Sequence, residues 1–100
     1  FLGPSDLAAS LGLLGQQEHP RVRAAVEHCL AAATAAGKPA GVNAFNPETA
    51  RAYLAAGAKF VLVGADVALL ARGSEALAAE YVRPAPAGGS NDGGKSPASY

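Results

Sequence analysis

Short apolar runs alternate along the chain with longer stretches whose apolar residues recur at helical spacing. Residues 59–64 form a β-branched and aromatic run, apolar on both faces, which is typical of a buried core strand in a parallel sheet. Residues 40–45 form a shorter apolar run between turn-forming residues and predict a second buried strand. Residues 1–2 lead straight into a Gly-Pro turn, as the end of a third strand would.

A helix is predicted after each of these strands, with an additional short helix at the start of the chain. Pro20 and Pro47 suit the first helical position, because their missing N–H group would have had no partner inside the helix. Asn46 and Asp66 are residue types that cap helix N-termini. The predicted helices cover residues 5–11, 20–36, 47–56 and 67–81.

One predicted helix, residues 20–36, has a clear packed face. Its apolar residues follow the i, i+3, i+4, i+7 pattern, and its charged residues lie away from them. The packed face is predicted to consist of Val22, Ala25, Val26, Cys29, Leu30 and Ala33.

The alternation of strand and helix predicts an α/β fold with a parallel sheet and right-handed crossovers. Three strands alone would leave both edges of that sheet unpaired. The pattern therefore fits the last units of a (β/α)8 barrel better than a free-standing domain, although a doubly wound α/β domain gives the same local signals. A strand-like start without Met also predicts that upstream residues complete the fold.

Composition divides the chain into a folded part and a tail. Residues 1–82 are predicted to fold, whereas residues 83–100 are rich in Pro, Gly and Ser and predict a flexible tail without a core. Ala accounts for 25 of the 50 apolar residues, so the core is expected to be thin for this length.

Charge and cysteine content exclude several classes of protein. Eight Lys and Arg balance eight Asp and Glu, which leaves no basic excess for nucleic acid and no cationic stretch for an anionic membrane. No apolar run approaches the roughly 20 residues of a membrane-spanning helix. Cys29 has no partner for an internal disulfide, and no signal peptide is recognisable. We therefore expect a cytoplasmic protein.

Candidate chemistry is expected in the loops that follow the strands, where parallel α/β folds bind ligands. The loop 3–6 is the most suggestive, because a Gly-Pro turn into a helix presents backbone N–H groups to an anion such as a carboxylate. Asp6 could ligate a hard divalent cation there, although capping the helix is the more common role for such a residue. The other two loops are residues 43–46 and 64–66.

A set of residues spread over positions 1–82 is specific enough to suggest a family. It consists of residues 1–12 (FLGPSDLAASLG), Gly15, His19-Pro20, Gly37-Lys38, Gly41, residues 52–54, Gly57, Phe60-Val61, Val63-Gly64, Asp66 and Leu70. In these residues the chain resembles the HpcH/HpaI family of metal-dependent (class II) pyruvate aldolases, which includes 4-hydroxy-2-oxoheptanedioate and 2-keto-3-deoxyglucarate aldolases.

The resemblance implies a TIM barrel of the phosphoenolpyruvate/pyruvate superfamily, about two and a half times as long as this chain. The chain would supply its last third, from the end of strand 6 to helix 8. The implied reaction is the reversible cleavage of 4-hydroxy-2-oxo acids to pyruvate and an aldehyde. Its implied cofactor is a divalent metal (Mg²⁺, Mn²⁺ or Co²⁺) that chelates pyruvate and stabilises its enolate.

The resemblance also assigns roles to individual residues. Asp6 matches the family's aspartate metal ligand, and the backbone N–H groups of Ser5 and Asp6, beside Gly3, match those that hold the pyruvate carboxylate. Asn43 and Ala65 fall near the aldehyde part of the substrate, where relatives carry larger apolar residues. The family's glutamate ligand, its arginine and its histidine–aspartate pair lie upstream, so this segment alone is expected to be inactive.

Two alternatives and several background roles remain open at this point. A citrate-lyase-β-like enzyme acting on acyl-CoA esters would share the fold and the use of a divalent metal. A truncated, non-catalytic product would act only in assembly. The complete protein is expected to be a homo-oligomer, a trimer or hexamer, with a small-molecule 2-oxo acid and aldehyde as partners. Structural or surface roles are expected for His19, His28, Cys29 and Lys59.

Overall fold

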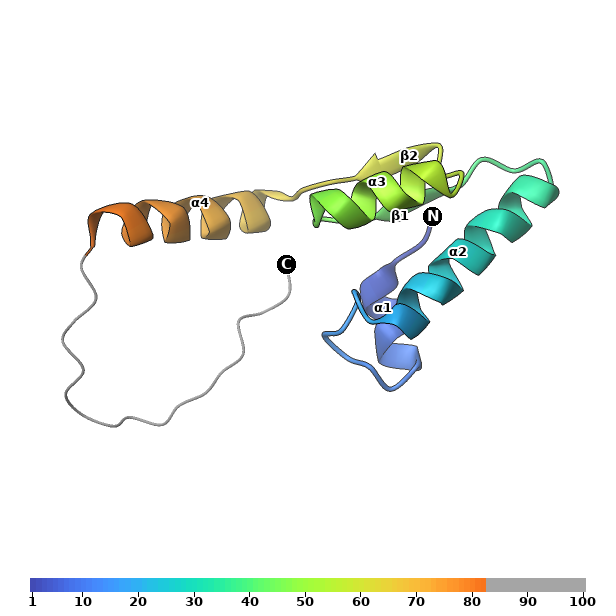
Figure 1. The fold of residues 1–100 in the computed structure, drawn as a ribbon, viewed down its shortest axis with the longest axis horizontal. Helices are drawn as coiled ribbons and strands as arrows, with labels where there is room; N and C mark the ends of the chain where they lie inside the picture. Colours follow the sequence, from blue (N-terminus) through green and yellow to red (C-terminus); the bar gives the residue numbers. More distant parts are fainter. Residues whose placement is uncertain (83–100) are drawn as a thin grey trace. The chain divides into compact units, whose positions relative to one another are not determined.

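The computed structural model describes residues 1–82, which divide into a unit of residues 1–64 and a second unit that starts at Ala65 (Figure 1). The predicted tail, residues 83–100, lies outside the described residues. The predicted alternation of helices and strands is confirmed. The elements are α1 (Pro4–Ser10), α2 (Pro20–Ala35), β1 (Gly41–Asn43), α3 (Pro47–Ala55), β2 (Phe60–Leu62) and α4 (Asp66–Tyr81).

The strands form a parallel sheet, as predicted. β1 pairs with β2 in parallel, with Gly41 opposite Phe60. Leu2 forms a parallel bridge to Val42: its N–H donates to the carbonyl of Gly41 (2.8 Å), and its own carbonyl accepts from the N–H of Asn43 (3.2 Å). In each of the runs 40–45 and 59–64, only three residues pair with the neighbouring strand, so β1 and β2 are shorter than the predicted strands.

The core of residues 1–64 lies between one face of this sheet and helices α2 and α3. Val42 on β1 contributes to it and is fully buried, and Leu2 and Val61 pack against it from the neighbouring strands. The predicted packed face of α2 is confirmed at Val22, Val26 and Leu30, all of which are buried. The remaining buried members of the core cluster are Ala40, Ala44, Ala50, Tyr53 and Ala58.

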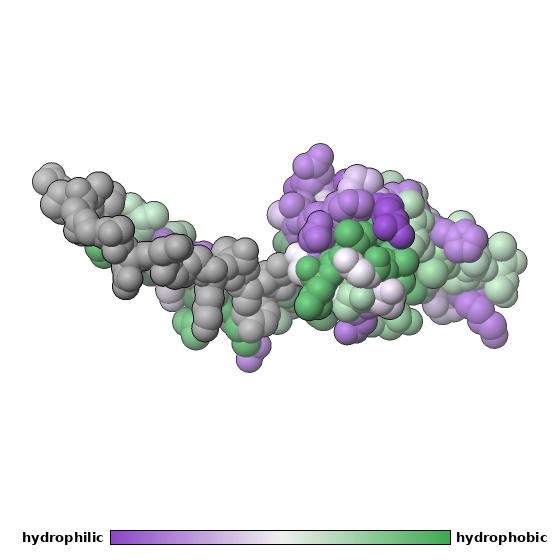
Figure 2. All heavy atoms as spheres, turned by 90° about the horizontal axis from the view of Figure 1, so that it is seen from below, coloured by the Kyte–Doolittle hydropathy of each residue, from purple (hydrophilic) through white to green (hydrophobic). Residues whose placement is uncertain are grey.

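The opposite face of the sheet is open, which corrects the prediction that residues 59–64 form a strand buried on both faces. Phe60 is 55% exposed and Leu62 is 48% exposed, whereas Val61 between them packs against the core. Successive side chains of a strand point to opposite faces, and residues 1–64 supply a covering layer on only one of them. Apolar atoms accordingly reach the surface beside polar ones (Figure 2).

An aromatic row crosses this open face of the sheet. The ring of Phe60 lies over Gly41, where an added Cβ would come within 2.2 Å of its Cζ atom. Phe1 stacks on the same ring, with centroids 5.6 Å apart and planes 19° apart. Because Gly41 has no side chain, the Phe60 ring can occupy the space above it.

The second unit begins with α4, whose start differs by one residue from the prediction. Ala65 is the N-cap residue, and Asp66 is the first helical residue rather than the cap. The carboxylate of Asp66 accepts a hydrogen bond from the N–H of Val67 (2.8 Å). Within residues 1–82, no helix has the length and apolar character needed to cross a membrane.

Candidate functional site

Leu2 and β1 run parallel to each other. The predicted loops that follow them, residues 3–6 and 43–46, therefore lie at the same end of the sheet. Leu2 and Val42 are bridge partners, so Gly3 and Asn43 are the next positions on neighbouring strands. Leu2 and Val42 face the core. The side-chain directions of Gly3 and Asn43 are therefore toward the open face of the sheet.

Asp6 sits on this open face, above Gly3. A Cβ added at Gly3 would lie 2.9 Å from Oδ2 of Asp6, so the carboxylate turns back over the glycine. The capping role expected for Asp6 is wrong: Gly3 is the N-cap residue of α1, and no side chain caps this helix. The reason is that Pro4 starts the helix two residues earlier, which puts Asp6 in the first turn rather than before it.

Asp6 and Ser5 are exposed at the start of α1. The first bond of this helix runs from the N–H of Leu7 to the carbonyl of Gly3 (3.0 Å). The N–H groups of Ser5 and Asp6 precede it and have no acceptor inside the helix. The arrangement offers two backbone donors and one carboxylate to a ligand above Gly3.

Asn43 brings a polar side chain to the same face. It is the only polar residue of β1, it is partly buried, and its carboxamide makes no hydrogen bond within residues 1–82. Ala65, the other residue assigned to the aldehyde end, is partly buried in the second unit as the N-cap of α4.

A metal ion would find one suitable ligand here. The carboxylate of Asp6 is the kind of hard oxygen donor that Mg²⁺ and Mn²⁺ prefer, and its position over a glycine leaves room beside it. Among residues 1–82, no three Asp, Glu, His or Cys side chains come together as a metal-binding group. Asp6 thus fits the role of one ligand in a site that needs further donors.

The expected background roles agree with the geometry. His19 is the N-cap of α2, where its Nδ1 accepts a hydrogen bond from the N–H of Arg21 (3.1 Å). His28 is exposed, and Cys29 is a partly buried free thiol on the packed side of α2.

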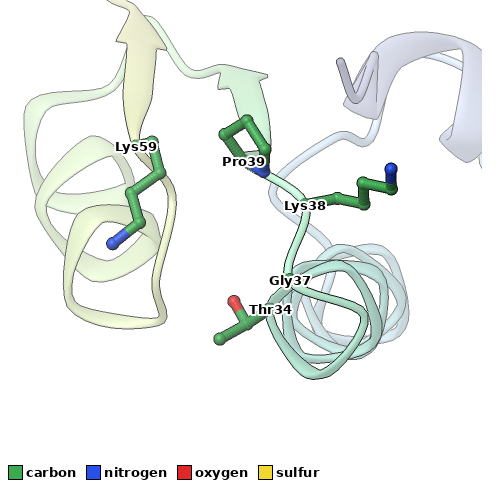
Figure 3. Close-up of a pocket in the computed structure, with 5 residues that line it drawn as sticks. All are labelled: Thr34, Gly37, Lys38, Pro39 and Lys59. Atoms are coloured by element: carbon green, nitrogen blue, oxygen red, sulfur yellow. The ribbon is translucent and has the colours of Figure 1, made fainter.

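Lys59 lies at the other end of the sheet, where it lines a hollow of about 310 Å³ together with Thr34, Gly37, Lys38 and Pro39 (Figure 3). The amino groups of Lys38 and Lys59 point in opposite directions in this view. The two cations therefore do not converge on a common anion.

A polar contact between the loop before α2 and helix α3 was not foreseen from the sequence. The hydroxyl of Thr49, on α3, donates a hydrogen bond to Oε2 of Glu18, in the loop before α2. Thr49 is buried, and Tyr53 one turn later buries a hydroxyl that has no hydrogen-bond partner within residues 1–82. The available signal was the spacing of Thr49 and Tyr53, which places both on one side of α3.

The pKa of Tyr53 reflects this environment. Burial of the phenol raises the pKa above its usual 10.0, and the nearby carboxylate of Glu18 raises it further. The guanidinium of Arg23 opposes the shift, and the carboxylate of Glu27 adds a smaller increase.

Comparison with known proteins places these features in a family. The family described as HpcH/HpaI aldolase/citrate lyase matches residues 1–73. Proteins named 4-hydroxy-2-oxo-heptane-1,7-dioate aldolase from Salmonella paratyphi B and Salmonella newport are each 49% identical over 81 residues, which covers 81% of this chain and 31% of the relative. The chain thus spans about a third of the length of these curated relatives.

A solved structure gives the same result. The crystal structure of an HpcH/HpaI aldolase/citrate lyase family protein from Burkholderia cenocepacia J2315 matches with a TM-score of 0.69 and 44% sequence identity. The match covers 78% of this chain and 30% of the other. Sequence and structure therefore agree that the chain belongs to the HpcH/HpaI aldolase/citrate lyase family.

Proposed function

We propose that this chain is part of a divalent-metal-dependent aldolase that reversibly cleaves 4-hydroxy-2-oxo acids to pyruvate and an aldehyde. Membership of the family and 49% identity to proteins named as aldolases support the reaction class. The observation that carries the proposal is the carboxylate of Asp6, held over Gly3 at the carboxyl end of the parallel sheet.

The roles of the residues follow from their positions. Asp6 would bind the cation, and the N–H groups of Ser5 and Asp6 would donate hydrogen bonds to the carboxylate of pyruvate. A bound Mg²⁺, Mn²⁺ or Co²⁺ would supply Lewis-acid stabilisation of the negative charge that develops during carbon–carbon cleavage. The further cation ligands and the proton-transfer groups would come from outside this chain.

Asn43 and Ala65 are proposed to contact the aldehyde part of the substrate. Asn43 supports this role because its carboxamide faces the same side of the sheet as the carboxylate of Asp6 and has no other partner within residues 1–82. A carboxamide at this position favours an aldehyde that carries a polar group. Asn43→Leu is expected to change the ranking of aldehyde acceptors in the complete enzyme.

The complete fold is proposed to be a TIM barrel to which this chain contributes the last third. The open face of the sheet supports this, because barrel strands bury that face against side chains from the other strands. A homo-oligomer, a trimer or hexamer, is the proposed assembly.

The proposal is tested in the full-length protein by replacing Asp6. With Mg²⁺ or Mn²⁺ present, Asp6→Ala is expected to lower pyruvate release from a 4-hydroxy-2-oxo acid by at least about a hundredfold, because the ligand stabilises the transition state by several kcal/mol. Glu80→Ala, which removes an exposed carboxylate from α4, is the control and should leave the rate unchanged.

Two results of this experiment would contradict the proposal. Activity and Mn²⁺ binding that survive Asp6→Ala would remove Asp6 from the metal site. Cleavage of acyl-CoA esters in place of 4-hydroxy-2-oxo acids would favour the citrate-lyase-like alternative, which the family description also includes.

A further inference from the structure

The contact between Glu18 and Thr49 joins two parts of the chain that are 31 residues apart. Thr49 is only 3% exposed and is the single buried polar residue in the part of the chain that the structure describes. A buried hydroxyl needs a hydrogen-bond partner, and the carboxylate of Glu18 is a strong acceptor for it. The contact is therefore a specific one, between the α1–α2 loop (residues 11–19) and α3.

The position of Glu18 strengthens this contact. Glu18 immediately precedes His19, the N-cap of α2, and its carboxylate touches Thr49 in the first turn of α3. Both helix N-termini carry partial positive charge, which favours a carboxylate near them. Asn46 already caps α3 by accepting from the N–H groups of Glu48 and Thr49, so Glu18 is bound by the hydroxyl and not by the backbone.

The α1–α2 loop is firmly attached to α1 at its other end. The N–H of Leu13 donates to the carbonyl of Ala8 (2.8 Å), and that of Gln16 donates to the carbonyl of Leu13 (2.9 Å). The N–H of His19 then donates to the carbonyl of Gln16 (2.9 Å). These consecutive hydrogen-bonded turns restrict the backbone between α1 and Glu18.

α1 is also attached at its start, where Leu2 pairs with β1. The chain therefore forms a closed path from Leu2 through α1 and its loop to Glu18, across to Thr49, and back through α3 to β1. With the Glu18–Thr49 bond broken, α1 would remain joined to the sheet at Leu2 and to α2 by packing. The bond adds to this packing a second restraint on the movement of α1 relative to the sheet.

We propose that Glu18 is a positioning residue, which acts through Thr49 and α1 to fix the carboxylate of Asp6 above Gly3. This inference rests on the proposed function, in which Asp6 binds the cation. Small displacements of a ligand weaken metal binding and substrate alignment, so a tie remote from the reacting atoms can affect both.

The test uses a double-mutant cycle in the full-length protein, with Glu18→Ala, Thr49→Val and the combination. Mn²⁺ affinity is measured by titration, KM and kcat are measured for a 4-hydroxy-2-oxo acid, and hydrogen exchange is followed over residues 4–16. Each single variant is expected to weaken Mn²⁺ binding by about threefold or more, with no further loss in the double variant. Exchange over residues 4–16 should become faster.

Two further variants show whether the hydrogen bond itself is responsible. Glu18→Gln keeps an acceptor oxygen and should restore most of the Mn²⁺ affinity that Glu18→Ala loses. Glu48→Ala removes an exposed carboxylate from the same first turn of α3, and it should leave Mn²⁺ affinity and KM unchanged.

The possible results distinguish this inference from the proposed function. If the variants lower only thermal stability, with Mn²⁺ affinity and KM unchanged, or if the effects of the single variants add, Glu18 is not a positioning residue. If Asp6→Ala leaves Mn²⁺ binding intact, the proposed function fails, whatever Glu18 does.

Discussion

Tyr53 places the polar end of a large side chain inside an otherwise apolar core. The residue is fully buried, and its hydroxyl has no hydrogen-bond partner within residues 1–82. An unpaired buried hydroxyl costs about 1–3 kcal/mol of the free energy of folding. Because the ring packs with Leu30 and Val42 in the core cluster, Tyr53 stabilises the fold by its ring and destabilises it by its hydroxyl.

Tyr53→Phe is therefore expected to raise the free energy of unfolding by about 1 kcal/mol at neutral pH. It should also alter the pH dependence. The pKa of Tyr53 in the folded protein lies above 10.0, so the unfolded chain loses this proton first and stability falls as pH rises above 10. Tyr53→Phe should not show this loss of stability above pH 10. Urea unfolding between pH 8 and pH 11 measures both effects.

Gly41 gives a second prediction at the level of single residues. Gly41→Ala would bring a Cβ within 2.2 Å of the Phe60 ring, which must then move and give up its stacking with Phe1. The expected loss is about 1–2 kcal/mol of the free energy of unfolding, measured by urea denaturation of the full-length protein.

The sign of this effect should depend on Phe60. In a Phe60→Ala background, Gly41→Ala meets no ring and is expected to stabilise the protein by about 0.4–1 kcal/mol, because Gly41 does not have a positive φ. An equal loss in both backgrounds would contradict the steric explanation.

At residue level, the sequence suggested which loop to examine for a site but not the geometry of that loop. The Gly-Pro turn and the rule for parallel strands located Gly3, Ser5 and Asp6, and the family resemblance assigned their roles. The direction of the Asp6 carboxylate was not predicted, because the helix was expected to start at residue 5 although Pro4 suits its first position. The bond between Glu18 and Thr49 depends on tertiary contact between distant segments, which local patterns do not contain.

Among the elements, α4 carries an apolar face that is exposed in the described chain. Val67, Leu70, Leu77 and Tyr81 recur at helical spacing, and each is at least 51% exposed. An exposed apolar face of this kind marks an association surface. We propose that this face of α4 packs on a neighbouring subunit of the homo-oligomer.

Leu70→Glu combined with Leu77→Glu is expected to shift the full-length protein to a smaller oligomer, because two carboxylates would be buried without partners. Size-exclusion chromatography with light scattering measures the mass. Ala79→Glu lies about opposite Leu70 on the helix, at roughly 100° per residue, and should leave the mass unchanged. An unaltered mass for the Leu70/Leu77 variant would exclude this face from the subunit contact.

The helices were predicted more accurately than the strands, for a physical reason. Pro20, Pro47 and Asn46 are local signals that act within one turn, and α2 and α3 begin at the predicted residues. The burial of residues 59–64 depends on which layers cover the sheet. Apolar side chains on both faces of a strand indicate that each face favours burial. The pattern does not show whether residues 1–64 contain a layer that covers each face.

For the molecule as a whole, the proposed barrel would explain both the open sheet face and the single carboxylate of the proposed cation site. The chain covers 31% of the length of its curated relatives, and the proposed barrel would supply both the missing strands and the missing ligands. Fold and chemistry would then depend on the same segments, so a protein that restores the closed sheet should also restore the cation site.

The aromatic row on the sheet has a consequence for how this family can change over time. Phe60 occupies the space above Gly41, and Phe1 is stacked on that ring. A lineage that carries Phe at position 60 cannot acquire a side chain at position 41 without loss, whereas one that first replaces Phe60 with a small residue can. The order of substitutions is therefore constrained, and the residues at positions 41 and 60 are expected to change together among relatives.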